Sequence, residues 1–145
     1  MTDPAPTLFP VFSDDWARAC AEVLNQRLGY RAAAATWEGA ILLMMTAIGP
    51  DQVERRVFLD LWHGDCREAR AAGPDDEAAA RYVLSGTVFA WRQVLTGIQA
   101  PLVAIMTGKL RLTKGSLIEL IPHVNAAKEL VAAAALVQAT FPDGA

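Results

Sequence analysis

Residues 91–115, WRQVLTGIQAPLVAIMTGKLRLTKG, contain the signals that decide the fold. The first apolar run has helical spacing and stops at Gly97, and Pro101 suits the first turn of a second short helix. From residue 109 to 113, apolar and polar side chains alternate, as in a strand with one exposed face. Two helices followed directly by a strand predict a domain in which helices pack against a sheet.

Upstream of this stretch, three segments predict an antiparallel meander. Residues 37–48 are apolar on both faces, which indicates a strand that is covered on both sides. Residues 53–62 predict a second strand and residues 66–72 a weaker third, with turn signals at 49–51 and 63–65. A further short strand is expected at residues 81–85. The sheet is therefore expected to be mixed, with about five strands.

Helices are expected on either side of these strands in the sequence. Ser13 is a candidate N-cap for a first helix that ends at Gly29. Ser116 and Glu119 have the spacing of a capping box, and Asn125 is a candidate cap for a last helix that extends to about residue 140. The order of elements predicts an α+β fold, with helices packed on one face of the sheet.

The composition fits one folded domain and excludes several other classes. The 145 residues are 53% apolar and 20% charged, with a net charge of −3, so disorder is excluded. No apolar run is long enough to span a membrane, and the basic residues are too scattered for a nucleic-acid partner or a stable membrane anchor. We expect a flexible leader at 1–12, a single domain at 13–142 and a tail at 143–145.

The two cysteines, Cys20 and Cys66, are too far apart in the sequence to form a redox pair or half of a zinc site. The N-terminal residues contain no secretory signal pattern. These features predict a reduced, cytoplasmic protein that needs no metal and no cofactor.

The usual catalytic motifs are absent from the sequence, so we expect no catalytic residue. The best enzymatic constellation is Asp60, His63 and Cys66, which offers a carboxylate, a base and a nucleophile. The spacing places His63 and Cys66 at opposite ends of a tight turn, where their side chains need not meet. Asp60 is expected to be an edge-strand carboxylate in water, and the other interpretation is a polar anchor for an apolar pocket.

The motifs WxxVLxG at 91–97, Pro101 and GKLxLxKG at 108–115 resemble the sterol carrier protein 2 family, in particular its stand-alone prokaryotic members. The Leu59-Asp60-Leu61 sequence before a Gly turn and the residues from 127 to 142 also fit. The resemblance implies five strands, helices over one face and an apolar tunnel between them. It also implies binding and carriage of fatty acids, fatty acyl-CoA, phospholipids or sterol-like molecules without chemical change.

An apolar ligand needs adaptable apolar walls, because burial of each CH₂ group contributes about 0.8 kcal/mol. Residues with apolar side chains in the predicted strands and helices are the candidate ligand-binding residues, and Leu136 is a further candidate to close the tunnel. The candidates are Leu42, Met44, Phe58, Phe89, Trp91, Val94, Leu95, Leu102, Ile105, Met106, Leu130 and Val131.

Two alternatives remain at this point. The first is an enzyme that acts on an apolar substrate in the same cavity. The second is an interaction module, because residues 130–137 are apolar on every face of the last helix and could form a homodimer surface. For Lys109, Arg111 and Lys114 we favour a solvated strand face over a site for a charged head group.

Overall fold

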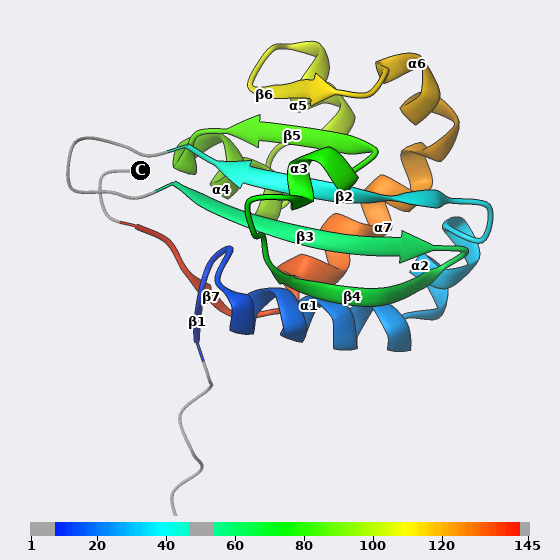
Figure 1. Ribbon diagram of the computed structural model, residues 1–145, viewed down its shortest axis with the longest axis horizontal. Coiled ribbons are helices and arrows are strands. Elements are labelled where there is room, and N and C mark those ends of the chain that lie inside the picture. The colour runs from blue at the N-terminus through cyan, green and yellow to red at the C-terminus, as the bar shows by residue number, and fades with distance from the viewer. Residues whose placement is uncertain (1–7, 47–53, 143–145) are drawn as a thin grey trace, which may run out of the picture.

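The computed structural model describes residues 8–46 and 54–142, and its centre is a mixed five-stranded sheet in the order β4-β3-β2-β5-β6 (Figure 1). Strands β2 (Glu38–Met45), β3 (Arg55–Trp62) and β4 (Asp65–Ala71) form the predicted antiparallel meander. Strand β5 (Tyr82–Gly86) pairs parallel to β2, and β6 (Leu110–Lys114) pairs antiparallel to β5. The turn expected at 49–51 and the tail at 143–145 lie outside the described residues.

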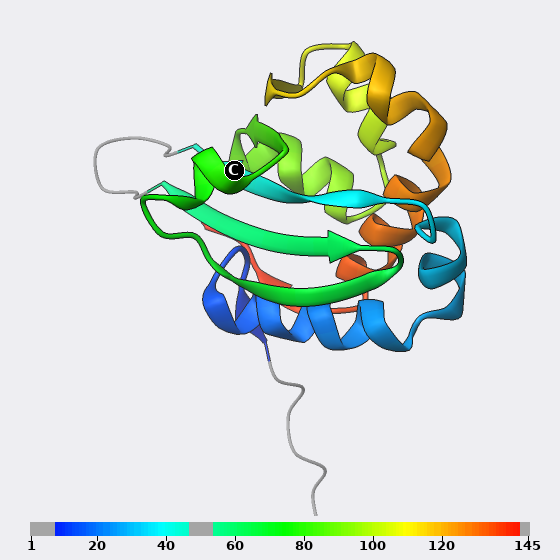
Figure 2. The same ribbon diagram turned by 45° about the vertical axis from the view of Figure 1, so that its right-hand side comes forward.

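One face of the sheet carries most of the helices (Figures 1 and 2). This layer holds α1 (Asp14–Gln26), α4 (Val88–Leu95), α5 (Pro101–Met106) and α7 (Val124–Ala135), and α2 (Leu28–Ala33) lies beside α7. The short helix α6 (Leu117–Leu120) continues into a 3₁₀ turn, Ile121–His123, which leads into α7. The α+β architecture with helices on one face is therefore confirmed.

The opposite face of the sheet is partly covered by the short helix α3 (Asp76–Ala79), which lies in front of β2 and β3 in Figure 1. A small apolar cluster forms beneath it, with Leu42, Phe58 and Val83 almost fully buried. This explains why β2 is apolar on both faces: one face meets the main helical layer and the other meets α3.

Two predicted helix boundaries are wrong. Ser13 does cap α1, because its hydroxyl accepts the Trp16 N–H at 3.2 Å. However, α1 ends at Gln26 rather than Gly29, because Arg27 adopts an extended backbone and α2 then begins at Leu28. The last helix ends at Ala135, and residues Ala139–Thr140 form the short strand β7 instead.

The capping box expected at Ser116 and Glu119 does not form. The side chain of Ser116 makes no capping hydrogen bond, and the carboxylate of Glu119 accepts the hydroxyl of Tyr82 at 2.7 Å instead. Asn125 is also no cap, since it lies inside α7, which follows directly from the 3₁₀ turn. A helix that continues from an earlier turn has backbone partners already, so no side-chain cap is needed.

The chain ends of the described region meet in a second, two-stranded sheet. Strand β1 (Phe9–Pro10) pairs parallel to β7, and the Val11 N–H donates to the Thr140 carbonyl at 2.9 Å. Val11 and Phe12 are 0% and 2% exposed, so residues 8–12 belong to the packed domain rather than to a leader. The ring of Phe12 packs against Trp16 and Trp91 in the centre of the helical layer.

Candidate functional site

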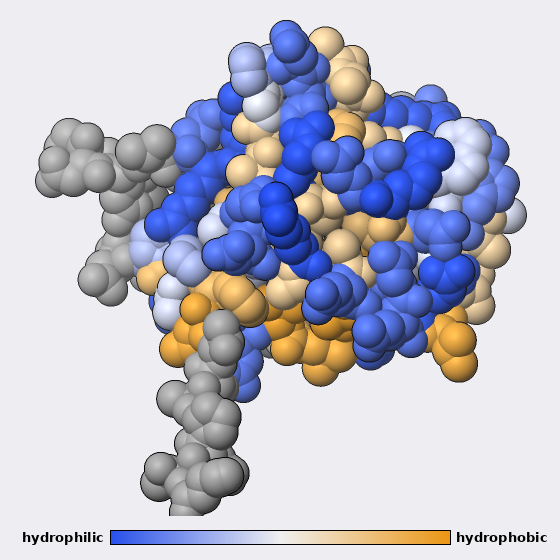
Figure 3. Space-filling model, turned by 60° about the horizontal axis from the view of Figure 1, so that its bottom comes forward, coloured by the Kyte–Doolittle hydropathy of each residue, from blue (hydrophilic) through white to orange (hydrophobic). Residues whose placement is uncertain are grey.

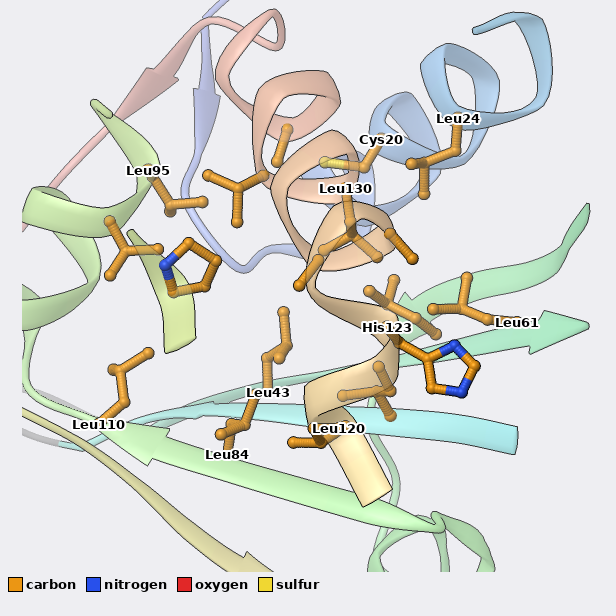
Figure 4. A pocket seen from close by; sticks show the side chains of 18 of the residues that line it. Cys20, Leu24, Leu43, Leu61, Leu84, Leu95, Leu110, Leu120, His123 and Leu130 are labelled. Atoms are coloured by element: carbon orange, nitrogen blue, oxygen red, sulfur yellow. The ribbon is translucent and has the colours of Figure 1, made fainter. Parts of the chain in front are cut away.

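An apolar cavity of about 100 Å³ lies between the sheet and the helical layer (Figure 4). Strands β2, β3, β5 and β6 each contribute leucine or isoleucine to its floor, including Leu43 from β2 and Leu84 from β5. Helices α1, α2, α4, α5 and α7 form its walls. Among the described residues, its lining holds no Asp, Glu, Lys or Arg. Such a site can hold an apolar group and offers almost no handle for polar chemistry.

More than half of the candidate ligand-binding residues are brought together around this cavity. They come from α4, α5 and α7, whose apolar sides face the sheet: Trp91, Val94, Leu95, Leu102, Ile105, Leu130 and Val131. Trp91 is fixed in place because its indole N–H donates to the Met44 carbonyl at 2.8 Å.

Three of the other candidates lie on the far face of the sheet. Leu42 and Met44 alternate with the pocket-facing residues Ile41 and Leu43 along β2, and Phe58 is the register partner of Leu42. The alternation of the strand was predicted, but the sequence does not indicate which face meets the cavity, because α3 gives the second face its own apolar cover.

The remaining candidates face outward from the helical layer. Phe89 on α4 and Met106 on α5 are 55% and 72% exposed, and Leu136, beyond the end of α7, is 62% exposed. Phe89 and Met106 lie in helices whose apolar residues exceed what one buried side needs. The sequence pattern therefore predicted the helices but not which apolar residues point inward.

Several cavity residues were missed by the sequence analysis. Tyr30 on α2 is 1% exposed, and Cys20 on α1 is 3% exposed. Burial raises the pKa of both side chains well above the ordinary value. Tyr30 was missed because Gly29 predicted the end of a helix, whereas Gly29 lies inside α2. Leu120 and His123 were also missed, because they lie in a four-residue helix and a three-residue 3₁₀ turn, which are too short to show an apolar periodicity.

A polar cleft of about 310 Å³ adjoins one end of the cavity, and Trp37 and His123 line both. The cleft also contains Arg81, whose guanidinium donates to the Glu38 carbonyl at 2.9 Å and lies 3.6 Å from the Glu119 carboxylate. A molecule with an apolar body and a polar end could occupy the cavity and the cleft together.

The cleft holds one guanidinium, that of Arg81, and the carboxylates of Glu38 and Glu119. The Glu119 carboxylate lies 3.6 Å from Arg81, and the Glu38 carboxylate contacts His63. Tyr82 donates its hydroxyl to Glu119, and burial together with this hydrogen bond raises the pKa of Tyr82. The cleft therefore offers both donors and acceptors for the polar end of a ligand, without a strong net charge.

The enzymatic constellation of Asp60, His63 and Cys66 is not assembled. Asp60 forms an ion pair with Arg67 at 2.9 Å and does not line the cavity, so it is no anchor there. The expected edge position is wrong, because β3 lies between β2 and β4 in the sheet. His63 contacts the Glu38 carboxylate at 2.8 Å. Cys66 is buried, and burial, followed by the charge of Asp60, raises its pKa to about 12. Among the described residues, no hydrogen bond joins these three side chains.

Residues 8–46 and 54–142 contain no group of three or more His, Cys, Asp or Glu residues that could hold a metal ion. Nor do they contain a helix with the length and apolar character that crossing a bilayer requires.

The fold and the cavity define a class of small α+β proteins that enclose an apolar site between one mixed sheet and a layer of helices. A crystal structure of sterol carrier protein 2 is similar to this chain, with 40% sequence identity, a TM-score of 0.79 and coverage of 88% of this chain and 98% of that one. The chain belongs to the sterol carrier protein 2 family.

Two further solved structures are similar. A conserved hypothetical protein of Thermus thermophilus, described as possibly a sterol carrier protein, is 37% identical, with a TM-score of 0.81 and coverage of 99% of this chain and 100% of that one. Sterol carrier protein 2 of Yarrowia lipolytica, in its apo form, is 16% identical over 81% and 87% of the two chains, and its TM-score of 0.56 shows a shared fold. No protein-family model and no curated protein matches the chain.

Proposed function

We propose that this protein binds and carries an apolar lipid without transforming it, with the hydrocarbon part of the lipid in the cavity. The observation that carries the proposal is the cavity lining, in which the described residues supply no Asp, Glu, Lys or Arg. A fatty acid, a fatty acyl-CoA, a phospholipid and a sterol-like molecule all have the required apolar body. The name sterol carrier protein 2, which the 40% identical relative bears, supports a lipid as the cargo.

The energetics favour a lipid with a long hydrocarbon part. Burial of one CH₂ group contributes about 0.8 kcal/mol, so a long acyl chain brings on the order of 10 kcal/mol before the cost of ordering is subtracted. The adjoining cleft supplies N–H and carboxylate groups for a polar end, so a carboxyl or ester group need not enter the apolar cavity. A lipid would therefore bind with its polar end beside Trp37 and His123.

The apolar character of the last helix fits this function better than a separate partner surface. Helix α7 buries Ala126, Ala133 and Ala134, and it turns Leu130 and Val131 toward the cavity. Its apolar residues are thus largely used within the chain. A cytoplasmic location completes the proposal, and the two free, buried thiols of Cys20 and Cys66 support it.

The proposal is tested by native mass spectrometry of gently purified protein and by titration of delipidated protein with palmitate. We expect a co-purified lipid and saturable uptake of palmitate. Ala127→Phe, which places a ring in the cavity wall, should weaken uptake at least about tenfold, because the ring takes the space of several CH₂ groups. Ala135→Phe, on an exposed position of the same helix, is the matched control and should bind as the wild type does.

Absence of a co-purified lipid, together with no uptake of palmitate, oleoyl-CoA or phosphatidylglycerol, would contradict the proposal. Equal palmitate uptake by both variants would place the binding site elsewhere. Mass spectrometry after incubation also tests the enzymatic alternative, since a carrier returns its ligand chemically unchanged.

A further inference from the structure

Among the described residues that line the polar cleft, one side chain is cationic and two are anionic. Arg81 supplies the guanidinium, and Glu38 and Glu119 supply the carboxylates. With His123 neutral, one positive and two negative groups give the cleft a net charge of −1. A ligand group that enters the cleft therefore meets more negative than positive charge.

The guanidinium of Arg81 is already engaged within the protein. It donates to the Glu38 carbonyl at 2.9 Å and lies 3.6 Å from the Glu119 carboxylate. It also lies over the ring of Tyr82, 5.5 Å from the ring centroid. A ligand carboxylate that approached Arg81 would come close to the Glu119 carboxylate as well. Because like charges repel, the attraction of Arg81 for such a group is offset.

The two carboxylates, in contrast, each keep one oxygen for a ligand. Oε2 of Glu119 accepts the hydroxyl of Tyr82, and Oε1 of Glu38 contacts Nε2 of His63. The other oxygens, Oε1 of Glu119 and Oε2 of Glu38, have no hydrogen-bond partner among the described residues. Since an ionised carboxylate can only accept hydrogen bonds, the group that fits these oxygens is a donor.

Charged side chains alone would not mark this cleft as a binding site. The face of the molecule in Figure 3 is mostly hydrophilic, and its hydrophobic residues gather along the lower edge. Solvated charges of this kind are normal on a protein surface. The cleft differs because Trp37 and His123 line both the cleft and the apolar cavity, so a molecule that fills the cavity would bring its polar end to these charges.

The position of His123 indicates which end of a ligand reaches the cleft. In Figure 4 His123 lies at one end of the cavity, and Leu95 and Leu110 lie at the other. The lining beside Leu95 and Leu110 is apolar, so it suits hydrocarbon and disfavours a polar group. The polar end of an extended lipid would therefore lie at the His123 end, beside the cleft.

We propose that the cleft selects lipids whose polar end donates hydrogen bonds and carries no negative charge, as a hydroxyl or an amino group does, over lipids that end in a free carboxylate. A donor end satisfies Glu38 and Glu119, whereas a carboxylate end leaves their free oxygens unpaired and adds a third negative charge. Glu38 and Glu119 are thus specificity-determining residues, which act by repelling one kind of polar end as well as by attracting the other.

This selection deepens the proposed function and rests on it, because it requires the hydrocarbon part of the lipid to fill the cavity. Burial of the hydrocarbon contributes equally for ligands of one chain length, whatever their polar end. Palmitate therefore still binds, and the cleft ranks the polar ends of ligands that have equal chains.

The test is competition between three ligands that share a twelve-carbon chain. Delipidated full-length protein is incubated with equal amounts of dodecanol, dodecylamine and dodecanoate, and the bound ligands are extracted and quantified by mass spectrometry. We expect the alcohol and the amine each to be retained about fivefold more than the acid, because the side chains of the cleft are partly solvated and their charges are screened.

Variants of the cleft should change the ratio of dodecanol to dodecanoate in opposite directions. Glu119→Gln and Glu38→Gln keep an accepting oxygen but remove the charge, so each should lower the ratio about threefold. Arg81→Gln removes the cation and should raise the ratio. Glu22→Gln, on α1, is the matched control, because Glu22 is exposed, lines neither the cavity nor the cleft and should leave the ratio unchanged.

A ratio separates selection from general damage, because a disturbed cavity would retain less of both ligands. Equal retention of the three ligands by the wild type, or preference for dodecanoate, would overturn the selection and leave the proposed function standing. A ratio that Glu119→Gln and Glu38→Gln leave unchanged, or that Glu22→Gln lowers equally, would also overturn it. Retention of none of the three ligands would contradict the proposed function itself, and the selection with it.

Discussion

The indole of Trp37 and the imidazole of His123 meet edge to face, with ring centroids 4.9 Å apart and planes at 87°, where the apolar cavity adjoins the polar cleft. Trp37 is held from two sides, because its N–H donates to the Gly39 carbonyl at 2.8 Å and its ring lies 5.2 Å from that of Tyr82. His123 belongs to a three-residue 3₁₀ turn between two helices. Of the two rings between the cavity and the cleft, we therefore expect the His123 imidazole to move more easily than the Trp37 indole.

Replacement of His123 by alanine should speed the release of a bound fatty acid. The imidazole lies where the cavity adjoins the cleft, and its removal leaves most of the apolar wall in place. We expect the dissociation rate of a fluorescent fatty acid, measured by stopped flow, to rise about tenfold. Leu28→Ala is the control, since Leu28 is 82% exposed, lines neither the cavity nor the cleft and should leave the rate unchanged. Identical rates in both variants would rule out a barrier at His123.

The thiol of Cys66 should be inert in the folded protein. Burial raises its pKa from 9.0 to about 12, so the reactive thiolate is about a thousandfold scarcer at neutral pH than in an exposed cysteine. Labelling with iodoacetamide, followed by mass spectrometry, should be slow in buffer and fast in urea. Rapid labelling of folded protein at Cys66 would instead support the enzymatic alternative, in which Cys66 acts as a nucleophile.

Asp76 should make the protein less stable in acid. Its carboxylate accepts hydrogen bonds from Arg70 and from the Gly73 N–H, and these interactions lower its pKa from 3.8 to about 2. The lowered pKa means that the stabilisation is complete above pH 3.8 and is lost as the pH falls toward 2. The loss amounts to about 2 kcal/mol.

Urea unfolding at several pH values measures this effect. Asp76→Asn keeps the shape of the side chain but cannot ionise, so the variant should lack this part of the acid dependence. An unchanged slope of stability against pH in Asp76→Asn would show that other carboxylates account for the acid sensitivity.

Gly115→Ala should cost about 3 kcal/mol of stability or more. Gly115 has a φ of 96°, and an added Cβ would collide with the ring of the buried Tyr82. Gly108 has a φ of 79° with no atom within 4 Å of its added Cβ, so Gly108→Ala carries only the backbone cost, about 1 kcal/mol. The difference between the two variants in urea unfolding isolates the contact with Tyr82, and equal losses would show that the ring simply moves aside.

The strands and most helices follow from patterns that are local in the sequence. The two-sided apolar pattern of β2 and the alternation of β6 need only neighbouring residues, and the cap at Ser13 needs a residue three positions away. Other local signals fail because a residue far away in the sequence binds the side chain that the local pattern assigns to a cap. Glu119 has the spacing of a capping box, but the hydroxyl of Tyr82, which lies far away in the sequence, takes its carboxylate.

The candidate site was only partly predictable for the same reason. Apolar residues of α4, α5 and α7 could be assigned to the cavity because the resemblance places helices over the sheet. Leu42, Phe58 and Met106 have equally apolar sequence environments, but their direction depends on where α3 and α5 come to lie. Periodicity shows that a face is apolar and does not show which neighbour covers it.

The pairing of β1 with β7 joins the first and last strands of the described chain by backbone hydrogen bonds. Hydrogen bonds at Phe9 and Val11 hold the segment that follows α7, and the ion pair between Arg27 and Glu129 at 2.8 Å fastens the helix to α2. Helix α7 is thus held to the rest of the fold along its length and cannot swing open as a lid. We therefore expect the cavity to open at the α5 and α6 end, which lies outside this tie between the chain ends.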